Sequence, residues 1–179
     1  MQLTCIRHTR VAVPSGICYG QTDVPLAGSY AEELETVKKR VKSFRFDRIF
    51  CSPLSRCRKL ADDLFPGLEI RFDDRLKELH FGDWENKGWE EIFFSAAGRH
   101  WMEHYLEAAC PGGESYLLFR SRILSFLSEL RQTGLEKIVL VTHNGVIRLL
   151  KSILEKMTVE EVFEQFNPAY GGVYSFALE

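Results

Sequence analysis

The chain has 179 residues, of which 45% are hydrophobic and 27% are charged, and its formal net charge is −2. This is the ordinary balance of a globular protein, so we expect one domain spanning residues 1–179. No block rich in Lys and Arg stands out and no apolar run approaches the ~20 residues of a membrane-spanning helix, which argues against nucleic-acid and membrane partners.

Short apolar runs alternate with amphipathic stretches, the pattern of an α/β fold. Residues 2–7 are the first predicted strand. A helix is expected to begin at Ser29, where Glu32, three residues on, completes a capping box. The apolar face of this helix would consist of Leu34, Val37, Val41 and Phe44.

The next predicted unit is a strand at 48–51 followed directly by a helix. Ser52 is a good N-cap and Pro53 suits the first helical position, so the helix is expected to run from there through Leu64. A third strand is predicted at 68–73.

The second half of the chain begins with a segment of different composition. Residues 80–113 are rich in Trp, Phe, Gly and Glu and are interpreted as a helical, lid-like insertion. The apolar spacing then predicts a long helix at 114–132, a buried strand at 138–142, helices at about 145–156 and 158–166, and a last strand at 173–178. Thr158 and Glu161 form a second predicted capping box.

Polar side chains follow the predicted strands at the points where those strands end. They are Arg7 and His8, then Ser55 and Arg56, then Glu78, and finally His143 and Asn144. Because ligands bind outside the carboxyl ends of the strands in an open α/β sheet, we expect two histidines, two arginines and one glutamate at one rim.

This mixture of side chains suits the transfer of a phosphoryl group. Guanidinium groups and the start of a helix bind phosphate oxygens, which favours Arg7 and Arg56 with the turn at 52–56 as the anion site. A neutral imidazole such as His8 can attack phosphorus, and a second histidine can stabilise the transition state. A protonated glutamate can supply the leaving alkoxide with its proton.

Six motifs, in order along nearly the whole chain, resemble those of the histidine phosphatase (phosphoglycerate mutase-like) superfamily. They are Arg7-His8-Thr9, the stretch 20–26, Ser52-Pro53-Leu54-Ser55-Arg56, Leu76-Lys77-Glu78 with the run 81–85, Gly112-Gly113-Glu114-Ser115, and the stretch 141–148. The resemblance implies a three-layer α/β/α sandwich with a mostly parallel central sheet and the helical insertion over the site. No metal or other cofactor is implied.

The resemblance also implies roles for individual residues. His8 would be phosphorylated in a covalent intermediate, while Arg7, Arg56 and His143 would bind the phosphate. Glu78 would give a proton to the leaving group and then activate water; Asp83 and Glu85 are nearby alternatives for the acid. In this family the segment that contains Gln21 and Thr22 borders the substrate, although a simple turn is the alternative.

Within the superfamily the sequence most resembles the α-ribazole phosphatases of cobalamin biosynthesis, through the 81–85 and 112–115 runs. The expected function is therefore hydrolysis of a small phosphate monoester, α-ribazole 5′-phosphate in the first place. A broad-specificity phosphatase, a phosphoglycerate mutase and a non-catalytic phosphate-binding module are the alternatives. Thr9 and Asn144 depart from the family pattern, because glycine is usual at both positions.

Three further features have modest interpretations. The five cysteines, an odd number without a secretory signal before them, are expected to be free buried thiols in a cytoplasmic protein. His100 and His104 have the spacing of a metal pair, but a solvated helix face is the favoured interpretation. Trp84, Trp89 and Trp101 are expected to pack the insertion onto the domain; stacking of one of them on a substrate base is the alternative.

Overall fold

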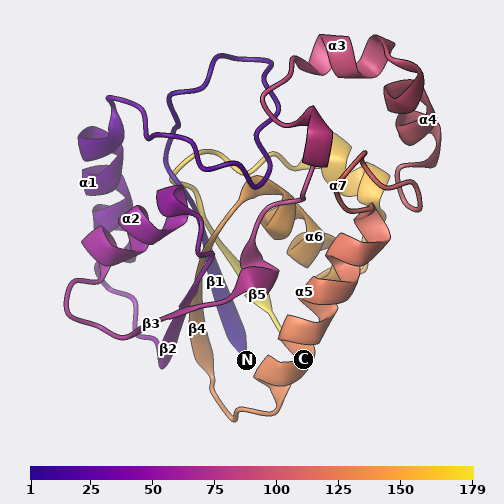
Figure 1. Ribbon diagram of the computed structural model, residues 1–179. Coiled ribbons are helices and arrows are strands. Elements are labelled where there is room, and N and C mark those ends of the chain that lie inside the picture. The colour runs from indigo at the N-terminus through magenta and orange to yellow at the C-terminus, as the bar shows by residue number, and fades with distance from the viewer.

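The computed structural model describes residues 1–179 and contains one five-stranded sheet (Figure 1). The strand order is β3-β2-β4-β1-β5. Four strands are parallel: β1 (Gln2–Arg7), β2 (Arg48–Cys51), β3 (Ile70–Phe72) and β4 (Lys137–Thr142). The edge strand β5 (Val173–Ala177) runs antiparallel to β1. The predicted mostly parallel sheet is confirmed.

Helices cover both faces of the sheet, so the predicted α/β/α sandwich is also confirmed (Figure 1). One layer consists of α1 (Tyr30–Val41) and α2 (Ser55–Leu64). The other consists of α5 (Tyr116–Arg131) and α6 (Asn144–Leu154), with α7 (Val159–Gln165) packed against α6. The central strands have no polar face because each is buried by a helix layer on both sides.

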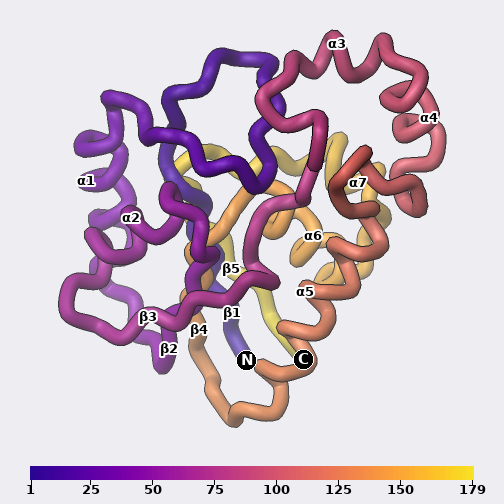
Figure 2. The backbone as a smooth tube through the Cα atoms, viewed as in Figure 1, coloured from indigo at the N-terminus to yellow at the C-terminus, as the bar shows by residue number.

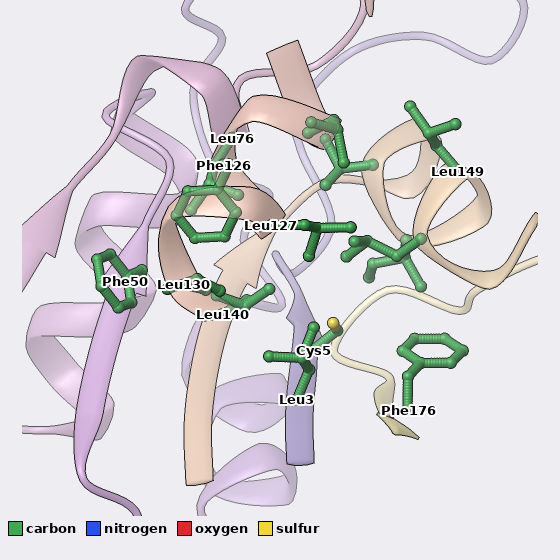
Figure 3. Close-up of a cluster of buried hydrophobic side chains, with 14 of the residues drawn as sticks. Leu3, Cys5, Phe50, Leu76, Phe126, Leu127, Leu130, Leu140, Leu149 and Phe176 are labelled. Atoms are coloured by element: carbon green, nitrogen blue, oxygen red, sulfur yellow. The ribbon is translucent and has the colours of Figure 1, made fainter. Parts of the chain in front are cut away.

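The alternation of side chains along β4 shows how the two cores divide. Leu140 points into the cluster shared with α5 and α6, whereas Val139 and Val141 point into the cluster shared with α1 and α2. Figure 3 shows the first of these clusters, in which Phe50 of β2 and Phe126 of α5 meet edge to face at 5.4 Å between ring centres. Both faces of one short apolar strand are thus used for packing.

Ser29 is the N-cap of α1, as predicted, but its predicted capping box is wrong, and the helix start predicted at Ser52 is also wrong. The hydroxyl of Ser29 does not cap α1 but donates to the carboxylate of Glu33 at 2.6 Å, so the capping box with Glu32 does not form. Helix α2 begins at Ser55 and its N-cap is Leu54. The hydroxyl of Ser52 is instead fully buried beside His143, where it accepts a hydrogen bond from the Leu54 N–H.

Other boundaries differ by a few residues. Phe44 lies beyond the end of α1, although it still packs against the same core, and β3 is shorter than the predicted 68–73. The capping box of Thr158 and Glu161 is present at α7. A 3₁₀ turn at Asp74–Leu76 follows β3 and leads to Glu78.

Residues 80–113 are helical, as predicted: a 3₁₀ turn at Gly82–Trp84 is followed by α3 (Trp89–Phe94) and α4 (Ala96–His104). The start of this insertion lies beside the loop that follows β1 (Figure 2). The N–H of Trp89 donates to Gly16 O at 2.7 Å, and the N–H of Cys18 donates to Lys87 O at 2.9 Å. That the segment acts as a lid stays a prediction.

The tryptophans of the insertion pack as expected. Trp84 is 5% exposed and shares a small core with Cys18, Ile92 and Cys110. Its ring meets Trp101 edge to face at 5.7 Å. This core joins the insertion to the loop after β1, and it accounts for Trp84 without any contact to a ligand.

Three smaller expectations concern burial and exposure. All five cysteines are free and buried. His100 and His104 lie on the exposed side of α4, and no group of three or more His, Cys, Asp or Glu side chains could hold a metal ion. None of the helices combines the length and the apolar character needed to span a bilayer.

Candidate active site

The two histidines meet because the two central strands are in register. Arg7 at the end of β1 pairs with Thr142 at the end of β4, so His8 and His143 leave adjacent parallel strands at the same edge. Their ring centres are 5.2 Å apart with the rings at 62°. Both side chains are buried, and together with Arg7 and Arg56 they form what we call the histidine site.

The protonation of His8 follows from one hydrogen bond. Its Nδ1 lies 2.7 Å from the carbonyl oxygen of Thr9, which can only accept, so Nδ1 carries a hydrogen. Burial and the charge of Arg56 lower the pKa of His8 well below its usual range, against the opposing effect of that hydrogen bond. The ring is therefore neutral, and the free lone pair is on Nε2.

His143 is neutral for similar reasons. Burial, then the charge of Arg56, lower its pKa well below the usual range. Its Nε2 lies 2.7 Å from Ser52 Oγ and 3.5 Å from Cys57 Sγ. Burial also raises the pKa of Cys57, which keeps that thiol protonated. Ser52 and Cys57 thus orient the ring from the side of α2.

Arg56 is 1% exposed and is held by backbone carbonyls rather than by a carboxylate. It donates to Gly20 O at 2.7 Å and to Thr22 O at 3.0 Å. Arg7 likewise donates to Pro168 O at 2.5 Å. The Nε groups of both arginines are buried and have no partner in the chain, so each retains a donor for an anion.

Two tyrosines that the sequence did not suggest connect these arginines. The Arg7 guanidinium carbon lies 3.8 Å from the ring centre of Tyr170, and that of Arg56 lies 5.5 Å from the ring centre of Tyr19. The two hydroxyls are 2.8 Å apart. Tyr170 also lies beside His8, at 5.7 Å between ring centres. Both tyrosines sit in irregular segments, where no periodic pattern marks a residue as part of a site.

Glu78 reaches the same region from the segment after β3. Its carboxylate accepts hydrogen bonds from the N–H of Leu79 and from the N–H of Gly145, both at 3.0 Å. Gly145 lies two residues after His143 in the first turn of α6, so Glu78 is held at the start of that helix. A Cβ at position 145 would lie 2.2 Å from Glu78 Oε1, and only glycine allows this approach.

Gln21 and Thr22 border the histidine site through their backbone and through Glu85. One carboxylate oxygen of Glu85 accepts from the Gln21 N–H at 2.8 Å, and the other accepts from the N–H and the hydroxyl of Thr22. Glu85 also accepts from the Phe81 N–H at 3.1 Å. Because the Glu85 carboxylate accepts these four hydrogen bonds and so holds the loop in place, Glu78 is favoured over Glu85 as the acid. Asp83 is exposed.

The family model of the histidine phosphatase superfamily (branch 1) matches residues 3–179. The chain belongs to the histidine phosphatase superfamily. This confirms the resemblance drawn from the motifs and the expectation that the chain is a phosphatase enzyme.

Individual relatives of this histidine phosphatase are distant but cover most of its length. The adenosylcobalamin/alpha-ribazole phosphatase of Salmonella typhimurium is 28% identical over 156 residues, which are 84% of this chain and 77% of the relative. The alpha-ribazole phosphatase of Shigella flexneri superposes with a TM-score of 0.88 at 25% identity and covers 98% of this chain and 89% of that one. A mycobacterial glucosyl-3-phosphoglycerate phosphatase solved with VO3 gives a TM-score of 0.83 at 25% identity, covering 98% and 92%.

The histidine phosphatase thus brings two buried guanidinium groups together with two neutral imidazoles. The departures from the family pattern fit into this arrangement. The amide of Asn144 donates to Asn167 Oδ1 at 3.1 Å, which ties the start of α6 to the segment after α7. The hydroxyl of Thr9 is fully buried and has no partner in the chain. Neither replacement removes a charged member of the site.

Proposed function

We propose that this phosphatase hydrolyses phosphate monoesters through a phosphohistidine at Nε2 of His8. The observation that carries the proposal is the hydrogen bond from His8 Nδ1 to Thr9 O, which fixes the lone pair on Nε2 in a ring kept neutral by its surroundings. In the first step Nε2 forms a bond to phosphorus while the bond from phosphorus to the ester oxygen breaks. In the second step water attacks phosphorus, the P–N bond breaks, and neutral His8 and phosphate are regenerated.

In this proposal the charged residues stabilise the phosphoryl group during its transfer. Arg7 and Arg56 offer buried guanidinium donors to its oxygens, and His143, whose ring centre lies 5.2 Å from that of His8, stabilises it from beside the nucleophile. Glu78 protonates the departing alkoxide and then accepts a proton from the attacking water. Its position at the start of α6, two residues from His143, supports this role.

Trapping the intermediate tests the mechanism. Brief incubation with a labelled monoester should give a protein-bound phosphate that is labile in acid and stable in alkali. His8→Ala should lose both the label and phosphate release while its circular dichroism remains that of the folded protein. His100→Ala, which removes an exposed histidine of α4, is the matched control and should retain both. Full labelling of the His8→Ala protein would refute the assignment.

For the substrate we propose α-ribazole 5′-phosphate. The support is that the Salmonella and Shigella relatives are α-ribazole phosphatases, each similar to this protein over more than four fifths of its chain. A fold alone does not fix a substrate, and the mycobacterial relative acts on a different phosphate ester. A comparison of kcat/KM for α-ribazole 5′-phosphate, nucleotides, sugar phosphates and phosphoglycerates decides among them. Equal values across the panel would favour a broad-specificity phosphatase, and primed phosphoglycerate interconversion would favour a mutase.

A further inference from the structure

Arg122 on α5 uses every donor of its guanidinium group on one short stretch of chain and one carboxylate. Its Nη1 donates to Arg75 O at 2.5 Å and to Lys77 O at 2.7 Å, and its Nη2 donates to Glu78 O at 2.8 Å. Nη2 and Nε also donate to the two carboxylate oxygens of Glu114, at 2.6 and 3.1 Å. Five N–H donors therefore have five acceptors. The side chain is 18% exposed.

We call the hydrogen bonds of Arg122 to this stretch of chain the clamp. Glu114 extends the clamp to the other side of Glu78. Its Oε1 accepts from the N–H of His80 at 2.9 Å, and its side chain is 15% exposed. The Arg122–Glu114 pair thus holds the backbone on both sides of Glu78. The held groups are the carbonyls of Arg75 and Lys77 before it and the N–H of His80 after it. Gln21 adds a further hydrogen bond to the Glu78 carbonyl at 3.0 Å.

The segment that carries Glu78 has no regular structure to hold it. The strand β3 ends at Phe72 and the 3₁₀ turn ends at Leu76, so the carbonyls of Lys77 and Glu78 are not part of a strand or helix. Three carbonyls close together in the sequence converge on one cation, which fixes the path of the chain. The guanidinium of Arg122 is anchored because α5 packs firmly against the sheet. Residues on either side of Arg122, namely Phe119, Ile123 and Phe126, are buried in the core cluster that α5 and α6 share.

We propose that Arg122 is a positioning residue of the reaction, which acts through Glu78 and does not touch the substrate. This inference rests on the proposed function, in which Glu78 protonates the leaving group. Arg122 and Glu114 fix the backbone around Glu78, while the N–H of Gly145 holds its carboxylate. Loss of the clamp displaces the acid while leaving His8, His143 and the two arginines of the histidine site in place.

The dependence of the rate on the leaving group tests this role. A nitrophenolate departs without a proton, whereas an alkoxide needs one, so misplacing the acid slows formation of the phosphohistidine only with alkyl phosphates. kcat/KM reports this first step, whereas the later attack of water, in which Glu78 is the base, is common to both substrates and affects kcat for both. Arg122→Met keeps the length of the stem and removes the five donors. We expect kcat/KM on glycerol phosphate to fall about 10- to 100-fold, since a misplacement of about 1 Å costs about that much, with a fall of less than about threefold in kcat/KM on p-nitrophenyl phosphate. Arg122→Lys should recover part of the loss.

Two further variants make the outcome decisive. Glu78→Gln should show the same selective loss, and Arg120→Met, which removes an exposed arginine of the same helix, should show none. A selective loss in both Glu78→Gln and Arg122→Met supports the inference. If Glu78→Gln is selective but Arg122→Met slows both substrates equally, Arg122 is only structural and the inference is wrong, while the proposed function stands. If Glu78→Gln is not selective, the proposed acid is wrong and the inference falls with it.

Folding of the variant is controlled by a gentler change. Should Arg122→Met fail to fold, Glu114→Gln keeps the shape of the pair and removes only its charge and one acceptor. The same selective loss, of about threefold or more on glycerol phosphate alone, is then the supporting result. An equal effect of Glu114→Gln on both substrates would overturn the inference.

Discussion

The guanidinium of Arg7 lies against the ring of Tyr170, 3.8 Å from the ring centre. The contact orients a buried cation that otherwise has one carbonyl partner, Pro168 O. Tyr170→Leu should weaken vanadate binding about 2- to 30-fold, because a cation–π contact contributes about 0.5–2 kcal/mol. Vanadate titration of the folded variant measures this. Tyr170→Phe, which keeps the ring, should bind within about twofold of the parent; an equal loss in both variants would assign the effect to the hydroxyl pair with Tyr19 instead.

Arg56 has the stronger effect on anion binding. Arg56→Ala should weaken binding of phosphate or vanadate about 10- to 150-fold, because one charge-assisted hydrogen bond contributes about 1.5–3 kcal/mol. The loop carbonyls of Gly20 and Thr22 also lose their donor. Isothermal titration gives the affinity. Arg56→Lys keeps the charge but not the paired donors of the guanidinium group, so its affinity should lie between those of the parent and of Arg56→Ala. An unchanged affinity in Arg56→Ala would place Arg56 outside the anion site.

The two buried histidines make the fold sensitive to acid. Their pKa values are lowered in the folded state, so below about pH 6.5 the unfolded chain takes up protons that the folded chain does not. Stability should therefore be full above that pH and fall as pH decreases, by at most about 1.4 kcal/mol per pH unit for each histidine. Urea unfolding at pH 7, 6 and 5 measures the slope. In His143→Gln the slope should be about half as steep; an unchanged slope would show that other groups dominate.

Gly145 is a position where activity and stability should separate. In Gly145→Ala the new methyl group meets Glu78 Oε1, whose side chain must move away. Because alanine is a better helix former than glycine, the first turn of α6 should lose little stability. We expect kcat on alkyl phosphates to fall about 10-fold or more while the midpoint of thermal unfolding stays within a few degrees of the parent. A parental kcat would mean that Glu78 works from another position.

Trp84 provides the opposite case, in which stability changes and specificity does not. Trp84→Ala removes a ring that is 5% exposed from the small core of the insertion, and the cost should be about 3–5 kcal/mol. Urea unfolding measures the cost, and Phe94→Ala, at a side chain 73% exposed on α3, should change it by less than about 0.5 kcal/mol. Turnover of p-nitrophenyl phosphate and of α-ribazole phosphate should change by the same factor. A loss confined to α-ribazole phosphate would instead indicate stacking on the substrate base.

The sheet and its rim could be predicted from the sequence because buried parallel strands read as short apolar runs. The residue after such a run lies at the carboxyl edge, which identifies His8 and His143, and the helix that starts after β2 adds Arg56. Glu78 follows its strand less directly, since the five residues 73–77, which include the 3₁₀ turn, separate it from the end of β3. The structure brings its carboxylate to Gly145.

The remaining features depend on contacts between distant segments. Tyr19 and Tyr170 are 151 residues apart and meet through their hydroxyls, so neither marks the other in sequence. Arg122 has an ordinary place on an amphipathic helix, and its carbonyl partners lie 44 to 47 residues away. The two missing caps have different causes. Ser29 donates to the side chain of Glu33 within α1, whereas Ser52 bonds His143, 91 residues away, which a local pattern cannot show.

The buried guanidinium groups of Arg7 and Arg56 have carbonyl oxygens as partners and form no salt bridge with a carboxylate. Their like charges therefore repel each other and disfavour protonation of the two imidazoles. This repulsion lowers the stability of the folded state. A dianion that enters relieves it, whether it arrives as the ester or leaves as free phosphate. The feature proposed to attract the substrate should thus also retain the product, so we expect inorganic phosphate to inhibit turnover and to protect the enzyme from unfolding, by about 2.7 kcal/mol at a hundred times its Kd.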